Sequence, residues 1–215
     1  MPEVFLSRQP LINRQNRILA NRLTLHLPAG ATADDAIQAL RAVSENWPRN
    51  EKPVFLRCLG GPAEPLVPGG DAPPNATFEL PGKAFAGPDA AALIADLQAA
   101  QASLCLMIDE HASAALSSGL SFRFIGLDAQ RLSPDQLKSM AAQTQAQGIG
   151  IAFNVADRQT FQTCIDAGLN AAATWFFKRP SGPSAKALNP GQAQIVRLLD
   201  LVRKNAGVKE IEAAR

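Results

Sequence analysis

SFRFIGLDAQRLSPDQLKSMAAQTQAQGIGIAFNVADRQTFQTCIDAGLNAAATWFFKRP, residues 121–180, is the stretch that decides the fold. Three short apolar runs, FRFIGLDA, IGIAFNVA and AAATWFFK, alternate in it with two helical patterns, and each unit spans about thirty residues. This alternation is typical of β-α-β-α-β, whose strands lie parallel. In such folds ligands bind at the carboxyl ends of the strands, which here fall at Asp128, Phe153 and Asn154.

The two helices of this stretch carry recognisable end signals. Ser133, followed by Pro134 and Gln136, predicts a capped start for the first helix, and Gly148 provides a stop. Asp157 is the cap expected for the second helix. Each helix has one apolar stripe at helical spacing, so we expect both to pack on a sheet.

The rest of the chain continues the alternation behind an N-terminal hairpin. Residues 3–7 and 17–27 have the pattern of two strands joined through the polar run INRQN. Further strands are expected at 53–59, 76–80 and 104–109, and helices at 32–46, 88–102 and 112–118. Counting parallel units gives about six or seven strands. We therefore predict an α/β fold, a TIM-type (β/α) barrel with an N-terminal β-hairpin that is irregular or incomplete on one side.

One segment interrupts this pattern. Residues 60–75 read GGPAEPLVPGGDAPPN, which is too rich in Pro and Gly to hold a helix. A loop of this length is either a functional lid or the remnant of a lost element, and we favour the remnant.

The composition changes again beyond Pro180. A linker rich in Pro, Gly and Ser leads to an amphipathic helix at residues 191–205. We therefore divide the chain into a barrel domain, residues 1–182, and a linker with a C-terminal connector helix, residues 183–215. An amphipathic helix in this position either folds back or packs on a partner, and a homodimer is one such arrangement.

Length, composition and net charge limit the kinds of protein that this chain can be. The 215 residues, 47% of them hydrophobic, suffice for one α/β domain. A net charge of +2 gives no argument for nucleic acid, and no apolar run approaches the ~20 residues of a membrane span. Cys58, Cys105 and Cys164 lie in apolar patterns without metal-ligand spacing, so we expect small buried thiols. With a start unlike a signal peptide, these features predict a cytoplasmic protein.

The motifs RQPLIN, RILANRLTLHL, LMIDE, FIGLDAQRLSP and WFFKRP follow one another along the chain. In this order they resemble the EAL family of cyclic di-GMP phosphodiesterases, in the shortened form that precedes an HDOD domain in bacterial signalling proteins. RQPLIN resembles the opening strand of that family, and RILANRLTLHL the strand with its name motif. LMIDE is similar to the segment with an Asp pair, FIGLDAQRLSP to the KLD segment, and WFFKRP to the closing motif. The resemblance covers nearly the whole chain and implies an EAL-like barrel whose last helix connects to an HDOD domain.

The resemblance also implies a chemistry, in which acids and amides hold two divalent cations against a phosphodiester. The acid positions survive in this chain as Glu79, Asp109, Glu110 and Asp128. The other functional positions of the family fall on Arg22, His26, Arg57, Gly126, Phe153, Asn154 and Ala173. Two of these replacements put an arginine where a metal ligand is expected, and such an Arg would pair with Glu79 or Asp109. The comparison therefore implies that catalysis has been lost.

The candidates for ligand contacts are Gln9, Arg22, Arg57 and Arg179. Arg binds phosphates and carboxylates through a bidentate fork, so the three arginines would hold a phosphate or an acidic partner. We favour the alternative, in which they pair with the residual acids. Gln9 matches a family position near the bound nucleotide and would serve equally well as a loop organiser.

The residual acids have two interpretations as well. Their oxygens would suit one Mg²⁺ ion at the strand ends, whereas salt bridges and helix-capping contacts at the barrel mouth are the favoured alternative. His26 and His111 have no second His or Cys nearby, so we expect them at the mouth or the surface. We assign no catalytic residue, no metal ligand and no cofactor.

The sequence thus predicts a catalytically inactive EAL-like signalling module that acts by protein interaction or ligand sensing in cyclic di-GMP signal transduction. Two alternatives stay open: a phosphodiesterase with an unusual Mg²⁺ or Mn²⁺ site, and a cyclic di-GMP receptor without hydrolysis. The expected partner is a protein or an adjoining HDOD domain, with cyclic di-GMP as the ligand of the receptor alternative. Neither nucleic acid nor a membrane is expected.

Overall fold

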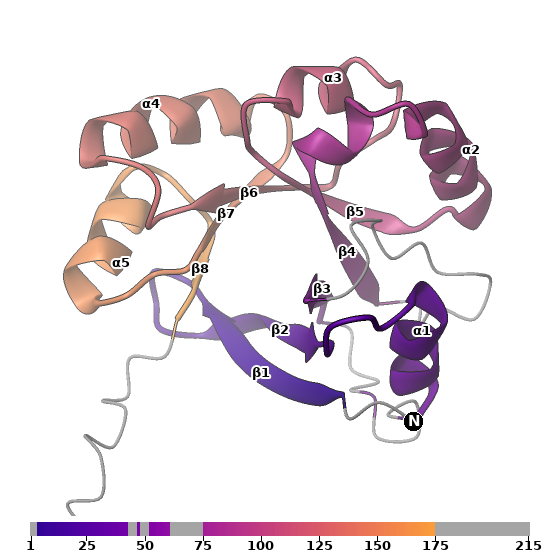
Figure 1. Cartoon of the computed structure of the whole chain (residues 1–215). Helices are drawn as coiled ribbons and strands as arrows, with labels where there is room; N and C mark the ends of the chain where they lie inside the picture. The colour runs from indigo at the N-terminus through magenta and orange to yellow at the C-terminus, as the bar shows by residue number, and fades with distance from the viewer. Residues whose placement is uncertain (1–3, 43–46, 48–51, 61–74, 175–215) are drawn as a thin grey trace, which may run out of the picture. The chain divides into compact units, whose positions relative to one another are not determined.

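The computed structural model describes residues 4–42, 47, 52–60 and 75–174. Within these residues eight strands close into a barrel in chain order (Figure 1). The strands are β1 (Phe5–Ile12), β2 (Ile18–His26), β3 (Val54–Leu59), β4 (Ala76–Pro81), β5 (Ser103–Met107), β6 (Phe124–Asp128), β7 (Ile149–Phe153) and β8 (Ala171–Ala173). Neighbours from β2 to β8 are parallel, whereas β1 is antiparallel to both β2 and β8. The predicted TIM-type barrel and N-terminal hairpin are confirmed. Of the two predicted alternatives, irregular or incomplete, the barrel is irregular: the ring of strands is closed, and β1 runs antiparallel to its two neighbours.

Helices follow the strands on the outside of this ring, as Figure 1 shows. They are α1 (Ala33–Ala42), α2 (Ala90–Ala100), α3 (Ala112–Leu116), α4 (Pro134–Gln145) and α5 (Arg158–Asp166), with a short 3-10 helix η2 (Gly82–Phe85) before α2. None of the helices in the described ranges combines the length and the apolar character that a bilayer crossing needs.

The helix ends in the central stretch follow the predicted capping chemistry. The Ser133 hydroxyl accepts a hydrogen bond from the Gln136 backbone N–H, and the Gln136 side chain accepts one from the Ser133 N–H. At α5 the Asp157 carboxylate accepts from the Thr160 N–H at 2.7 Å. These local bonds satisfy donors that a helix start leaves open, which is why sequence alone located both starts.

The first strand is longer than predicted. The sequence pattern predicted this strand over residues 3–7. The structure continues β1 to Ile12, because its ladder with β2 extends to Ile12, and Leu11 and Ile12 also pair with β8. The Pro10 carbonyl accepts from the Thr174 N–H.

Several predictions fall on residues that the structure does not describe. Of the predicted loop 60–75, only its two end residues belong to the described ranges. The end of the predicted helix 32–46 and everything from residue 175 onward also lie outside them, including Arg179 and the connector helix. The division of the chain at residue 182 therefore stays a prediction.

The sheet separates two kinds of packing. Outward side chains, such as Leu25, Leu106 and Leu127, are buried against the helix layer. Inward side chains form a separate interior cluster of Leu11, Ala20, Phe55, Cys105, Phe124, Ile151, Phe153, Ala171 and Ala173, with Met107 packed against it. Because side chains alternate along a strand, the residues that continue this inner face towards the carboxyl ends line the barrel mouth.

Candidate functional site

A buried ion pair lies next to the interior cluster. Arg22, on the inner face of β2, donates from Nε to Glu79 Oε1 at 2.7 Å and from Nη2 to Oε2 at 2.5 Å. The two side chains are only 3% and 2% exposed. This fork uses both carboxylate oxygens, so the pair is internally satisfied. The predicted pairing of an arginine with Glu79 is therefore present.

An aromatic ring closes the pair from one side. The Arg22 guanidinium carbon lies 4.3 Å from the centroid of the fully buried Phe153 ring, which is a cation–π contact. Phe153 in turn packs edge-on against Phe55, with ring centroids 5.9 Å apart. The position that the resemblance assigns to a carboxylate ligand thus holds a packed apolar ring.

Gly126 makes room for this arrangement. A Cβ atom at this residue would overlap the Met107 sulfur and would come within 2.8 Å of the Phe153 ring. The resemblance places a lysine of the family here, and no such side chain fits beside Phe153 and Met107. The two replacements are therefore sterically linked.

Arg57 lies at the same mouth, on the inner face of β3 and opposite Thr24 of β2. It is half-buried. Burial, followed by the positive charge of Arg22, lowers the pKa of Arg57, while Glu79 and Asp128 act in the opposite direction. Because the pKa of an arginine starts so high, the group stays charged at neutral pH.

Asp128 ends β6 and is held by its neighbours. Its carboxylate accepts from the Asn154 amide at 2.9 Å and from the Gln130 backbone N–H at 3.1 Å, and Arg131 Nε lies 3.5 Å away. Asn154 reaches it from a left-handed backbone conformation with φ of 56°. The side chain of Asp128 is 22% exposed, so it lies at the mouth and not in the interior.

Asp109 organises two loops at the rim. One carboxylate oxygen accepts from the Lys83 backbone N–H at 3.0 Å, and the other accepts from the His111 N–H at 2.9 Å. Its neighbour Glu110 is 82% exposed, with the His111 ring 3.9 Å away. Asp109 therefore makes the capping contacts that were favoured for the residual acids.

The remaining rim candidates lie on the hairpin. Gln9 is the cross-strand partner of Arg22 and shares its face of the sheet. His26 ends β2, and its Nε2 lies 2.8 Å from the Ser7 hydroxyl. The structure thus brings together Gln9, Arg22, Arg57, Glu79 and Asp128, whereas Asp109 holds the loops beside them and Glu110 is exposed at the rim.

This arrangement does not fit a two-metal centre. A guanidinium group occupies both oxygens of the most buried acid, and a phenyl ring covers the pair. Divalent cations need several free oxygen ligands, and positive charge repels them. Within the described residues no group of three His, Cys, Asp or Glu side chains has the geometry to hold a metal ion.

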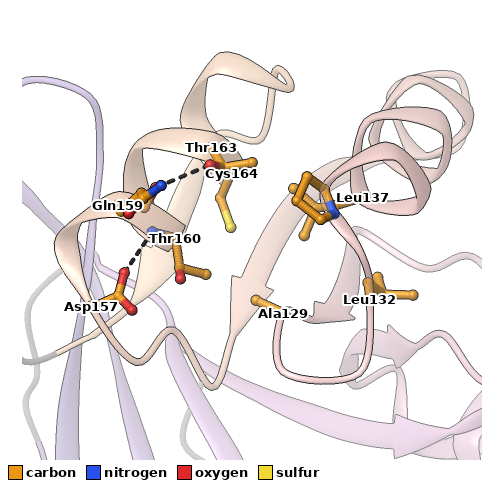
Figure 2. A pocket seen from close by; sticks show the side chains of 9 residues that line it. Ala129, Leu132, Leu137, Asp157, Gln159, Thr160, Thr163 and Cys164 are labelled. Atoms are coloured by element: carbon orange, nitrogen blue, oxygen red, sulfur yellow. Dashed lines mark hydrogen bonds between the residues drawn. The ribbon is translucent and has the colours of Figure 1, made fainter.

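A separate pocket lies outside the ring, between the starts of α4 and α5 (Figure 2). Its volume is about 220 Å³, and its lining includes Leu132, Leu137, Thr160 and Cys164. None of the described candidate residues lines it. Its one carboxylate, Asp157, is already used to cap α5.

The three cysteines are free, as predicted. Cys105 and Cys164 are buried, and Cys58 is half-buried. Burial raises the pKa of the Cys58 and Cys164 thiols to about 11, and burial also raises the pKa of Cys105 well above its ordinary value. Because the thiolate is the reactive form, these raised pKa values disfavour a nucleophilic role for the three thiols at neutral pH.

Solved EAL domains have the same fold. BlrP1 of Klebsiella pneumoniae, in a calcium and cyclic di-GMP complex, aligns with a TM-score of 0.61 at 12% identity, over 83% of this chain and 56% of its own. The EAL domain of Mycobacterium smegmatis DcpA aligns with 0.57 at 11%, over 80% and 90%. The EAL domain of Pseudomonas aeruginosa FimX, bound to cyclic di-GMP, aligns with 0.54 at 14%, over 81% and 89%.

The comparisons by sequence add nothing to this likeness. No protein-family model matches the chain, and no curated protein matches it. At identities of 11% to 14% the structural likeness establishes an EAL-type fold alone.

Sequence reasoning missed the packing that surrounds the ion pair. Phe153 was noted as a lost ligand, yet its contact with Arg22 and its dependence on Gly126 were not expected. The only signal was that three unusual replacements fall on inner-face positions of three strands. A residue-by-residue comparison treats these positions separately, whereas the barrel places them side by side.

Proposed function

We propose that this chain is a non-catalytic signalling module with the fold of a cyclic di-GMP phosphodiesterase domain. The supporting observation is the Arg22–Glu79 ion pair under the Phe153 ring, because it occupies the interior where a metal-dependent enzyme needs open carboxylates. On this proposal the chain acts by ligand sensing or by protein interaction. An adjoining HDOD domain or a second copy of the chain are the partners that we propose.

The test is an assay for cyclic di-GMP hydrolysis by the purified protein with Mg²⁺ and, separately, with Mn²⁺. We expect no linear product above a protein-free blank. The matched variant is Asp128→Asn, which removes a residual acid at the mouth while keeping the size of the side chain. Hydrolysis that is present in the wild type and lost in this variant would contradict the proposal and favour the enzyme alternative. Hydrolysis that is equal in both would come from a contaminating enzyme.

The receptor alternative has its own supporting observation. Several polar side chains of the inner face, including Gln9 and Arg57, lie at the mouth and take no part in the Arg22–Glu79 ion pair. Calorimetric titration with cyclic di-GMP distinguishes the two modes. Binding without product would identify a ligand sensor, and the absence of binding would leave protein interaction as the mode of action.

A further inference from the structure

Arg57 differs from the other charged side chains of the mouth. It forms no hydrogen bond or ion pair with any residue in the part of the chain that the structure describes, although it is half-buried. Arg22 and Arg131, in contrast, each face a carboxylate. A half-buried guanidinium without a counterion has lost part of its hydration and gained little in return.

The acids close to Arg57 are already engaged. Glu79 directs both oxygens to Arg22, and Asp128 accepts from Asn154 and faces Arg131. Among the described residues, the charges that act on Arg57 are those of Arg22, Arg131, Glu79 and Asp128, so this group has three guanidinium groups and two carboxylates. One further negative charge would balance the group.

We propose that the barrel mouth binds one phosphate-type oxyanion directly through the Arg57 guanidinium, without a metal ion. The planar fork of arginine matches two oxygens of a phosphate group. The Thr24 hydroxyl is a further donor on the strand next to Arg57, and the Gln9 amide lies on the same inner face, opposite Arg22. Free phosphate and the phosphodiester of a cyclic dinucleotide both present oxyanion oxygens to the guanidinium fork; the diester is a monoanion, and free phosphate at neutral pH is a mixture of monoanion and dianion.

This inference adds a specific binding site to the proposed ligand sensing. It rests on that proposed function for the identity of the molecule that carries the phosphate group. The experiment measures binding by calorimetry, in EDTA and at constant ionic strength, with inorganic phosphate in one arm and cyclic di-GMP in the other. Arg57→Gln is expected to weaken binding about tenfold or more, since a charge-assisted bond is lost. Arg57→Lys keeps the charge without the fork, so it should give an intermediate loss and show that the site tolerates substitution.

The matched control is Arg14→Gln. It makes the same change in net charge at a side chain of the β1–β2 turn that is 68% exposed and faces Asp166 of α5, so phosphate affinity should stay within about twofold of the wild type. Binding in the phosphate arm would identify free phosphate as a sufficient ligand, and binding in the cyclic di-GMP arm alone would identify the nucleotide as its source. Either result supports the site.

Three results would overturn the proposal: no binding in either arm, equal affinities of the wild type and Arg57→Gln, or binding that requires added Mg²⁺ or Mn²⁺. These outcomes are separate from the fate of the proposed function. Hydrolysis of cyclic di-GMP that Asp128→Asn abolishes, together with metal-independent binding through Arg57, would refute the non-catalytic role and leave the anion site standing.

Discussion

Glu79 in the barrel interior and Asp109 at its rim are both acids at positions that the resemblance assigns to metal binding, yet their surroundings differ. Glu79 is almost fully buried and is paired with Arg22 across the barrel. Asp109 accepts hydrogen bonds from two backbone N–H groups in adjacent loops. In the interior, the Arg22 guanidinium thus neutralises the charge of Glu79, whereas at the rim the Asp109 carboxylate holds two backbone N–H groups in place. The same functional group, a carboxylate, serves two purposes because burial decides which partner it requires.

Breaking the interior pair should have the largest effect. Arg22→Ala leaves Glu79 buried without a counterion and is expected to lower the free energy of unfolding by about 3–5 kcal/mol. The double variant Arg22→Met with Glu79→Leu removes both charges and should cost about 1 kcal/mol or less. Urea unfolding measures both variants. Equal losses in the two would mean that the pair matters through its packing and not through its charge.

Filling the space beside the pair should have the next largest effect. Gly126→Ala forces a Cβ against Met107 and the Phe153 ring, so we expect a loss of about 1–3 kcal/mol in unfolding free energy. The control is Gly87→Ala, where a Cβ would meet no atom within 4 Å. A Gly126→Ala variant as stable as the wild type would show that the interior is less tightly packed than the contacts indicate.

At the rim, Asp109→Ala removes one acceptor from two backbone donors. We expect a loss of about 1–2 kcal/mol, because the Lys83 and His111 N–H groups lose their partner in a part of the fold that water still reaches. Chemical denaturation checks this value against Glu110→Ala, whose side chain is 82% exposed and should change little. If Asp109→Ala lowered the unfolding free energy more than Arg22→Ala does, the rim contact would matter more to stability than the buried ion pair, contrary to this comparison.

The helix cap at Asp157 should make the unfolding stability depend on pH. The Thr160 backbone N–H, followed by the Thr160 side chain, lowers the pKa of Asp157 from its ordinary value. A lowered pKa in the folded state gives stability that is present above the unfolded pKa of about 3.9 and is lost as pH falls through the folded pKa. The difference in unfolding midpoint between the wild type and Asp157→Asn should therefore shrink from pH 7 towards pH 3. A difference that does not change with pH would contradict this origin.

The smallest effect is expected at the exposed ion pair of the mouth. Arg131 is 81% exposed and lies 3.5 Å from Asp128. Arg131→Gln should change the unfolding free energy by about 0.5 kcal/mol or less, since solvent screens such pairs. Denaturation in low and in high salt checks this value, and a loss comparable to that of Arg22→Ala would place Arg131 with the interior group.

The sequence determined much of the fold by itself. The alternation of apolar runs and helical patterns predicted the parallel barrel, and local capping residues such as Ser133 and Asp157 located helix starts. These features depend on neighbours within a few residues, which a single sequence displays directly. The pattern of residues 3–7 alone underestimated β1, because its last residues are held by pairing with β2 and with β8, which lies far along the chain.

The candidate site was predictable only in part. The replacement of acids by Arg22 and Phe153, and a partner for Arg22 among the remaining acids, followed from the sequence and the resemblance. Tertiary structure alone decided that the partner is Glu79, that Phe153 covers the pair, that Gly126 yields the space, and that Arg57 is left without a partner among the described residues. The physical reason is that these contacts join β2, β3, β4, β6 and β7 across the inside of a closed barrel, where distance and burial, and not spacing along the chain, determine which charges meet.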